Sequence, residues 1–255
     1  MRRFPIGSPI AGLLVAILAG LAALLAGLAA CGEPDEAPAD PLAREDSLPL
    51  TARALPAGTF SLVSDIGDTL RFRVSPAGET IILARYRRAA GGVDSAVAVI
   101  DAESKAPLAS FRRIHTADGS VTAELLYGRG FDGQARLTLT APQGRQEDNI
   151  RTPYPALDAA QLPLVLSALH FGAPDTASFN YIASFEKEAF PARLEIGALV
   201  SLPGNEPVPA PSGPAAFRVR LRVSGLEERY WLAAEPPHRL LRFEETTRNV
   251  TWTLP

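Results

Sequence analysis

The chain has 255 residues, of which 25 are Lys or Arg and 28 are Asp or Glu, so its net charge is −3. This slightly acidic balance argues against a nucleic-acid-binding protein, whose electrostatic footprint is normally basic and clustered. The single cysteine excludes a disulfide within the chain and leaves no thiol cluster for a metal ion.

Residues 1–30 have the pattern of a signal peptide. Arg2 and Arg3 form a short basic start, and residues 10–30 carry no charge. The uncharged run is long enough to cross a bilayer as a helix, so a plain membrane-spanning helix is the alternative interpretation. We prefer a lipoprotein signal peptide because of the residues that end the run.

Those residues are Leu28, Ala29, Ala30 and Cys31, and they resemble the lipobox of bacterial lipoproteins. The resemblance implies that the Cys31 thiol receives a diacylglyceryl group and that the signal is cut just before it. The new amino group is then acylated as well, typically with palmitate. Two acyl chains would anchor the protein with roughly 20 kcal/mol, at about 0.8 kcal/mol per methylene. The residue after the cysteine is Gly32. An Asp at that position would resemble an inner-membrane retention signal, so we expect the protein at the outer membrane, facing the periplasm.

Cleavage removes two arginines and leaves 23 basic against 28 acidic residues, a net charge of −5. Residues 31–57 predict a flexible tether that follows the lipidated cysteine, because prolines and acidic residues dominate them. Residues 58–255 are long enough to bury a core as one domain. The prolines of the tether are at 34, 38, 41, 49 and 56, and its acidic residues at 33, 35, 36, 40, 45 and 46.

Beyond residue 58, apolar and polar residues alternate with the period of half-buried strands. The expected strands are 69–74, 81–87, 95–100, 109–115, 121–127, 134–140, 179–185, 193–200, 217–223, 230–234, 239–246 and 249–254. Asp118 and Gly119 mark a hairpin between two of them.

One helix interrupts the strands. Asp158 and Gln161 have capping-box spacing, but Pro163 would break that helix and more plausibly opens a short buried one that runs to Leu169. The fold class is therefore mainly β. We expect a strongly bent antiparallel sheet or unclosed barrel of about 11–12 strands with one short buried helix.

Motifs that carry chemistry find no support in their context. Residues 128–133 match G-x-G-x-x-G, but a strand rather than a helix follows them, so we expect a hairpin turn. Ser184 and Lys187 match S-x-x-K, but on a strand they would face opposite sides. His115, His170 and His238 are isolated. We therefore expect no catalytic residue, no metal and no cofactor, and the protein is predicted not to be an enzyme.

An aromatic set that includes Tyr181, Phe185, Phe217 and Trp231 is the candidate lining of an apolar ligand cavity, although core packing would select the same residues. The arginines at 218, 220 and 222 form a stripe that fits lipid headgroups, a partner or simply a solvated sheet face.

The last third of the chain carries a resemblance to known proteins. Residues 230–232 and 240–244 form a tryptophan strand, a proline turn and a Leu-x-Arg-x-Glu strand, similar to the closing strands of some uncharacterised bacterial lipoproteins. With the lipobox, the long sheet and the short helix, the chain resembles the periplasmic lipoprotein carriers and their receptors (LolA/LolB-like). The resemblance implies an unclosed barrel that holds acyl chains; no site residue transfers.

The expected function is that of a non-catalytic envelope lipoprotein whose curved sheet binds an apolar ligand or lipid. The alternative is an envelope structural or assembly protein that acts by protein–protein contact, and an enzyme with an unrecognised site comes third. The expected partners are the membrane, through the lipid anchor, and a lipid or another envelope protein. No nucleic acid is expected, and nothing in the sequence sets the oligomeric state.

Overall fold

A computed structural model describes residues 48, 50, 55–89, 91–128, 133–153, 155–171, 176–202 and 215–255. The chain divides into residues 1–43 and a compact unit from Arg44 to Pro255, and every described residue belongs to the second unit. The predictions for the signal peptide, for Cys31 and for most of the tether lie outside the described residues.

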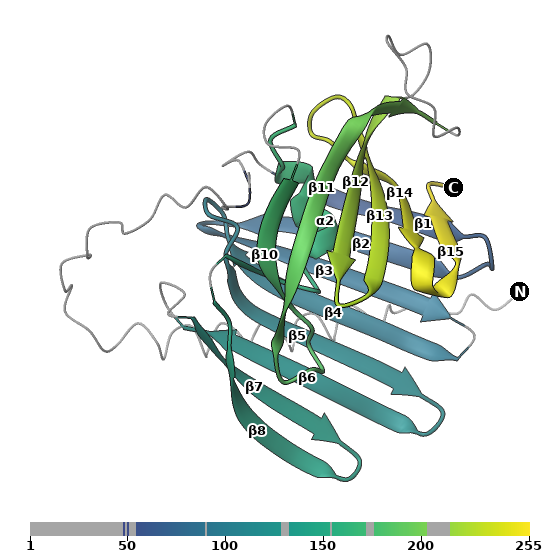
Figure 1. Cartoon of the computed structure of the whole chain (residues 1–255). Coiled ribbons are helices and arrows are strands. Elements are labelled where there is room, and N and C mark those ends of the chain that lie inside the picture. The colour runs from purple at the N-terminus through teal and green to yellow at the C-terminus, as the bar shows by residue number, and fades with distance from the viewer. Residues whose placement is uncertain are drawn as a thin grey trace, which may run out of the picture. The chain divides into compact units, whose positions relative to one another are not determined.

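The described residues form fifteen strands in one bent, unclosed sheet (Figure 1). Two antiparallel meanders meet edge to edge where β1 pairs with β15. The first meander consists of β1 (Gly58–Ser64), β2 (Thr69–Ala77), β3 (Thr80–Ala89), β4 (Gly92–Asp101), β5 (Pro107–Thr116), β6 (Gly119–Tyr127), β7 (Gln134–Ala141) and β8 (Gly144–Arg151).

The second meander begins at the far edge of the sheet and returns to β1. Its edge strand β9 (Ala156–Asp158) runs parallel to β10. The others are antiparallel: β10 (Thr176–Ile182), β11 (Ala189–Ser201), β12 (Ala215–Val223), β13 (Leu226–Ala233), β14 (Leu240–Glu245) and β15 (Val250–Thr253). In Figure 1, β10–β13 cross in front of the first meander.

The mainly β fold class is confirmed, but the strand count of 11–12 was too low. All twelve expected strands are present with shifted ends, and β1, β8 and β9 are additional. β8 shows no alternation because Ile150 is its only buried residue, and β9 is short and buried throughout. The strand expected over 179–185 ends at Ile182, so Phe185 lies in a turn.

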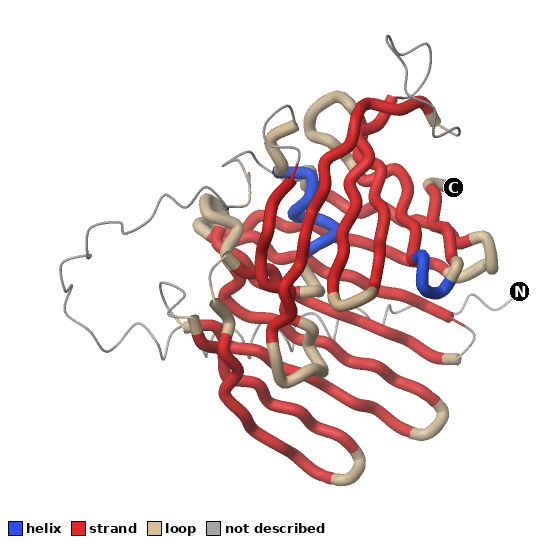
Figure 2. The backbone as a smooth tube through the Cα atoms, in the orientation of Figure 1, coloured by secondary structure: helices blue, strands red, loops and turns tan. Residues whose placement is uncertain are grey.

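The helix predicted from Pro163 is confirmed as α2 (Leu162–Val165), which continues as the 3-10 turn η1 (Leu166–Ala168). A second 3-10 turn, η2 (Thr246–Arg248), lies between β14 and β15. Every residue of α2 and η1 is buried because the segment lies between the two halves of the sheet (Figure 2). Asp158 does not cap α2: its N-cap is Gln161, without a side-chain hydrogen bond.

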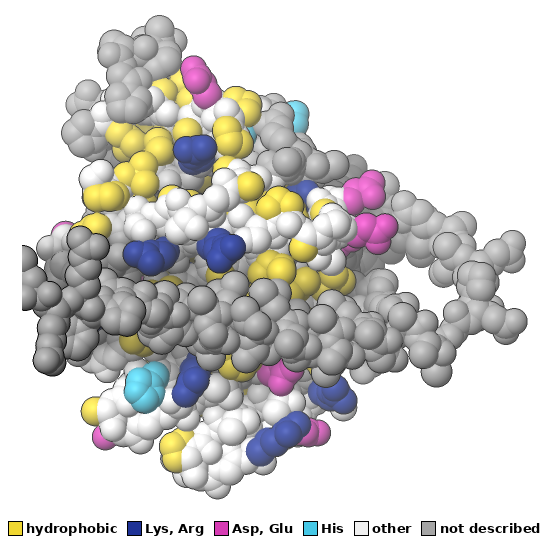
Figure 3. Space-filling model, turned by 180° about the vertical axis from the view of Figure 1, so that it is seen from behind, with side chains coloured by type: hydrophobic (Ala, Val, Ile, Leu, Met, Phe, Trp, Pro, Cys, Tyr) yellow, Lys and Arg dark blue, Asp and Glu magenta, His cyan; other side chains and the backbone are white. Residues whose placement is uncertain are grey.

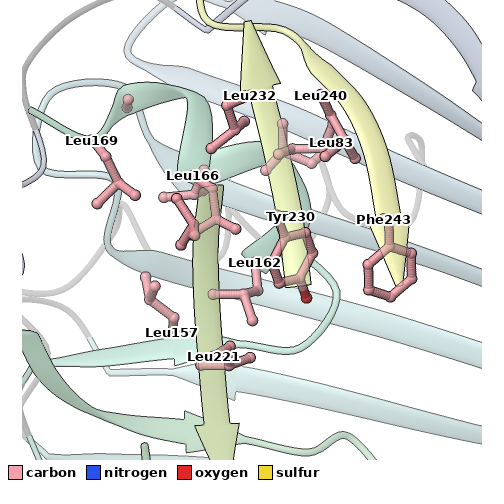
Figure 4. Close-up of a cluster of buried hydrophobic side chains, with 14 of the residues drawn as sticks. Leu83, Leu157, Leu162, Leu166, Leu169, Leu221, Tyr230, Leu232, Leu240 and Phe243 are labelled. Carbon is pink, nitrogen blue, oxygen red and sulfur yellow. The ribbon is translucent and has the colours of Figure 1, made fainter. Parts of the chain in front are cut away.

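The main core joins both meanders to this helical segment. Leu162 and Leu166 of the segment lie among Leu83, Leu232 and Phe243 from the sheet (Figure 4). Such side chains each contribute roughly 1.5–3 kcal/mol on full burial, so the segment is a large part of what the bent sheet packs against.

The folded unit also begins before the predicted boundary at residue 58. Leu55 is buried in the core, Leu48 and Leu50 pack against it, and Leu50 forms a β-bridge with Leu169. Leu48, Leu50 and Leu55 of the predicted tether therefore pack on the folded unit, because they bury apolar surface there.

Among the described glycines, Gly92 leaves the least room for a side chain. Its φ is +145°, and a Cβ would lie 2.1 Å from the carbonyl oxygen of His115. We expect Gly92→Ala to lower the free energy of unfolding by about 3 kcal/mol or more, through backbone strain and displacement of β5. Gly91→Ala is the matched control, because a Cβ at that position would meet no atom within 4 Å. Urea unfolding measures both; equal effects of the two variants would contradict the close approach.

Candidate functional site

The concave face of the sheet has an apolar half and a charged half. The helical segment fills the apolar half, whereas Arg85 and Arg87 follow Leu83 on the same face of β3. Charged and tyrosine side chains from both meanders gather around these two arginines, and we call this group the charged end. It consists of Arg85, Arg87, Asp94, Arg112, Tyr181, Glu228, Tyr230 and Glu245.

Asp94 is the best-paired carboxylate of the charged end. Arg112 donates two parallel hydrogen bonds to it, from Nε at 3.0 Å and from Nη2 at 2.8 Å, and Arg85 Nη2 lies 3.5 Å away. Although burial acts to raise the pKa of Asp94, the hydrogen bond from Arg112 and the nearby guanidinium charges hold it below the ordinary value. Arg112 also lies 5.2 Å from the ring centre of Phe185, which positions that ring at the charged end.

Arg87 ties the two meanders together beside their seam. Its guanidinium contacts Asp68 of the first meander at 3.3 Å and Glu245 of the second at 3.2 Å. It also lies 5.0 Å over the ring of Trp252, whose Nε1 donates to Glu245 at 2.9 Å. This part of the charged end therefore stabilises the fold.

Tyr181 and Glu228 form the less satisfied part. Burial raises the pKa of Glu228, and the Tyr230 hydroxyl donates to one of its oxygens. Burial, followed by the charge of Glu228, also raises the pKa of Tyr181. The Tyr181 hydroxyl makes no hydrogen bond to any described residue, and the buried Nε of Arg85 has no partner among them. The unpaired Nε of Arg85 is buried and therefore costly, whereas Tyr181 is half-buried and its hydroxyl is not enclosed, so a polar ligand can reach and satisfy it.

The four aromatic residues proposed as a cavity lining do not come together. Tyr181 and Phe185 lie at the charged end. Phe217 stacks on Phe171 with ring centres 4.3 Å apart, next to His238. Trp231 is fully buried on the other face of β13 and packs with residues of a separate cluster, namely Val200, Ala216, Leu202 and Leu241.

The remaining motif residues are dispersed. His115 Nδ1 lies 2.7 Å from Ser120 Oγ, and within the described residues no three His, Cys, Asp or Glu side chains gather as a metal site. Ser184 is buried and Lys187 pairs with Asp148 at 3.3 Å; both lie in a turn and not on the predicted strand. Most of the glycine motif, residues 129–132, lies outside the described residues.

Asp158 is the polar residue whose role was missed. It is fully buried, and its Oδ2 accepts hydrogen bonds from Ser110 Oγ and the Tyr127 hydroxyl, both at 2.6 Å. Its Oδ1 accepts from the Ala160 amide at 2.7 Å. The carboxyl thereby joins β9 to β5 and β6 across the concave face. Burial raises its pKa, and the three hydrogen bonds offset this only in part.

No protein-family model, curated protein or solved structure matches this chain. Among the described residues no helix has the length and apolar character to cross a membrane. Most of the shifted pKa values lie at the charged end and around Asp158, which is typical of functional sites and also of structural ion-pair networks.

The raised pKa of Asp158 predicts a pH-dependent stability. In the folded chain the Asp158 carboxyl keeps a proton that the unfolded chain releases above the ordinary pKa of about 4. The contribution of this carboxyl to the free energy of unfolding is therefore lost as pH rises through the raised pKa. Urea unfolding at a series of pH values, starting at about 4, the ordinary carboxyl pKa, and rising to neutrality, compares the chain with Asp158→Asn. We expect the chain to lose stability relative to the variant with rising pH; the opposite trend would mean that the hydrogen bonds outweigh burial.

Proposed function

We propose that the chain is a lipid-anchored protein of the bacterial cell envelope that binds a small polar ligand at the charged end, without catalysis. The observation that carries the proposal is the Tyr181 hydroxyl, which lies among charged groups without a hydrogen-bond partner in the described part of the chain. Phe185, stacked on Arg112, offers an apolar surface beside it. Binding sites typically combine such surfaces with a few convergent polar groups.

The packing of the concave face shapes this proposal. Leu162, Leu164 and Leu166 occupy the apolar half, where the resemblance to lipoprotein carriers would place an acyl chain. An acyl chain would have to displace these leucines, at a cost of several kcal/mol. At the charged end, a ligand with a hydrogen-bonding group meets polar and charged side chains to which it can bond, so we favour it over a purely apolar one.

A second candidate function is protein–protein contact through β8. This strand pairs only with β7 among the described elements, and nearly all of its side chains are exposed. Its charged residues, such as Arg145 and Glu147, are of the kind that discourages strand addition at a sheet edge. Crosslinking in cells from position 147 would test it; a single repeated partner would favour this function over ligand binding.

The role of the Tyr181 hydroxyl in ligand binding can be tested by removing its oxygen. We expect native mass spectrometry of the full chain in neutral detergent, incubated with a small-molecule extract of the envelope, to show an adduct of fixed mass. Tyr181→Phe should weaken that adduct about fivefold or more, as loss of a hydrogen bond worth roughly 1 kcal/mol implies.

Tyr86→Phe is the matched control, because Tyr86 lies on the opposite face of β3 from Arg85 and should leave the adduct unchanged. No adduct at all, or an adduct equally strong in both variants, would refute binding at the charged end.

The proposed anchor depends on Cys31. We expect Cys31→Ala to abolish incorporation of labelled palmitate and to leave the signal peptide uncut, since the thiol is the acyl acceptor that the lipobox implies. Gly32→Ala should be labelled and processed like the unaltered chain. Labelling and intact mass measure the result; an unaltered chain that keeps residues 1–30 would support the plain membrane-spanning helix.

A further inference from the structure

The outer face of β10–β14 carries a lattice of arginines and glutamates. In the register of these strands, Arg193 lies directly opposite Arg222, and Arg220 lies directly opposite Arg229. Like charges in directly opposed positions destabilise a sheet unless other groups compensate them. Two such pairs on neighbouring strands therefore require counter-charges.

The glutamates of this face compensate the arginines incompletely. The ion pairs join five arginines to only three glutamates: Arg193, Arg220, Arg222, Arg229 and Arg242 with Glu195, Glu227 and Glu244. Glu195 and Glu227 are each shared by three guanidinium groups. The hydrogen bond from Arg229, with the charges around it, lowers the pKa of Glu227. A chain of net negative charge thus presents a local excess of two positive charges.

A shallow depression of about 410 Å³ lies at the β10 side of this lattice. Arg193 and Arg222 line it, together with Ser178, Asn180, Pro155 and Pro191. Ser178 lies directly opposite Arg193 on β10. The Asn180 amide donates to the carbonyl oxygens of residues 153 and 155, at 2.7 and 3.3 Å, which holds the wall of the depression in place.

Arg193 is the least satisfied arginine of the lattice. Its side chain is 60% exposed, it makes no hydrogen bond to any described residue, and its Nε lies 3.8 Å from Glu195. Arg222 is 51% exposed and shares its partners with other arginines. Both guanidinium forks therefore keep donors that can turn toward the depression.

We propose that this depression binds an oxyanion of the phosphate type, held between Arg193 and Arg222 with the Ser178 hydroxyl as a further donor. Planar guanidinium groups bind phosphate and carboxylate oxygens through paired hydrogen bonds. The glutamates among the arginines disfavour a broad anionic membrane surface, which attracts uniformly basic segments. The positive charge that these glutamates leave uncompensated suits one discrete anionic group. On the reverse side, shown in Figure 3, basic side chains are spread singly or in small groups among apolar, neutral and acidic ones.

The test is arginine-specific labelling of the full chain in neutral detergent micelles, with phenylglyoxal and peptide mass mapping. Titration with inorganic phosphate should protect Arg193 and Arg222. Arg145, whose side chain is 64% exposed, should stay unprotected. Arg193→Gln should weaken protection of Arg222 about fivefold or more, and Arg145→Gln should leave it unchanged.

A second arm replaces phosphate with phosphatidylglycerol doped into the micelles. If phosphatidylglycerol protects the two arginines at a lower concentration of phosphate groups than inorganic phosphate does, the ligand is a lipid headgroup. If only inorganic phosphate protects them, the ligand is a free anion. Absence of protection in both arms, or equal protection of Arg145, overturns the proposal. The Tyr181-dependent adduct should persist in Arg193→Gln because the two sites lie on opposite faces of the sheet, so the failure of one site is distinguishable from the failure of the other.

Discussion

The fold depends on how a fifteen-stranded sheet stays bent when its two meanders share only a short seam. β1 and β15 pair at two positions, Val63 with Thr253 and Ser64 with Trp252, whereas β1 and β2 pair at six. Backbone hydrogen bonds contribute about 1 kcal/mol each, so such a short seam cannot define the bend alone. Side chains reinforce it: Arg87 contacts carboxylates of both meanders, and Asp158 joins β9 to β5 and β6.

One stretch of chain, residues 155–171, contributes most of the contacts that hold the sheet in its bent form. It provides the edge strand β9, the buried carboxyl of Asp158 and the leucines that fill the apolar half of the concave face. These roles depend on each other, because the leucines are buried only if the sheet bends over them, and Asp158 is desolvated only once it has. The same packing is the reason why we propose the charged end, and not the apolar half, as the ligand site.

The sequence predicted the elements better than their arrangement. Alternation identified β2 and β12 because one face of each strand is buried and the other is not. It failed for β8, which is exposed on both faces, and for β9, which is buried on both. The sequence singled out Asp158 only by its capping-box spacing to Gln161, which Pro163 argued against, while its actual partners, Ser110 and Tyr127, lie 48 and 31 residues earlier.

The aromatic residues illustrate the same limit. Of the four, Trp231 is fully buried, whereas Tyr181, Phe185 and Phe217 are half-buried. Burial also does not specify a face: Tyr230, Trp231 and Leu232 are all buried although successive residues point to opposite sides. An irregular register between Ile196 and Leu199 in β11 further separates side chains that a simple alternation would group. Which aromatic residues share a cavity is therefore a property of the folded sheet and of its bulges.

The two faces of β13 show how one strand presents two different chemistries. Glu228 and Tyr230 point inward, where three arginines face Asp68, Asp94 and Glu245, and where burial favours the protonated form of Glu228. Charges there nearly balance, so the ligand that we propose for the inner face would gain more from hydrogen bonds than from net charge. Glu227 and Arg229 point outward into a lattice with excess positive charge and high exposure. The ligand that we propose for the outer face is therefore an anion, and we expect its binding to weaken with salt, because exposed charges are screened within about 10 Å at 0.1 M ionic strength.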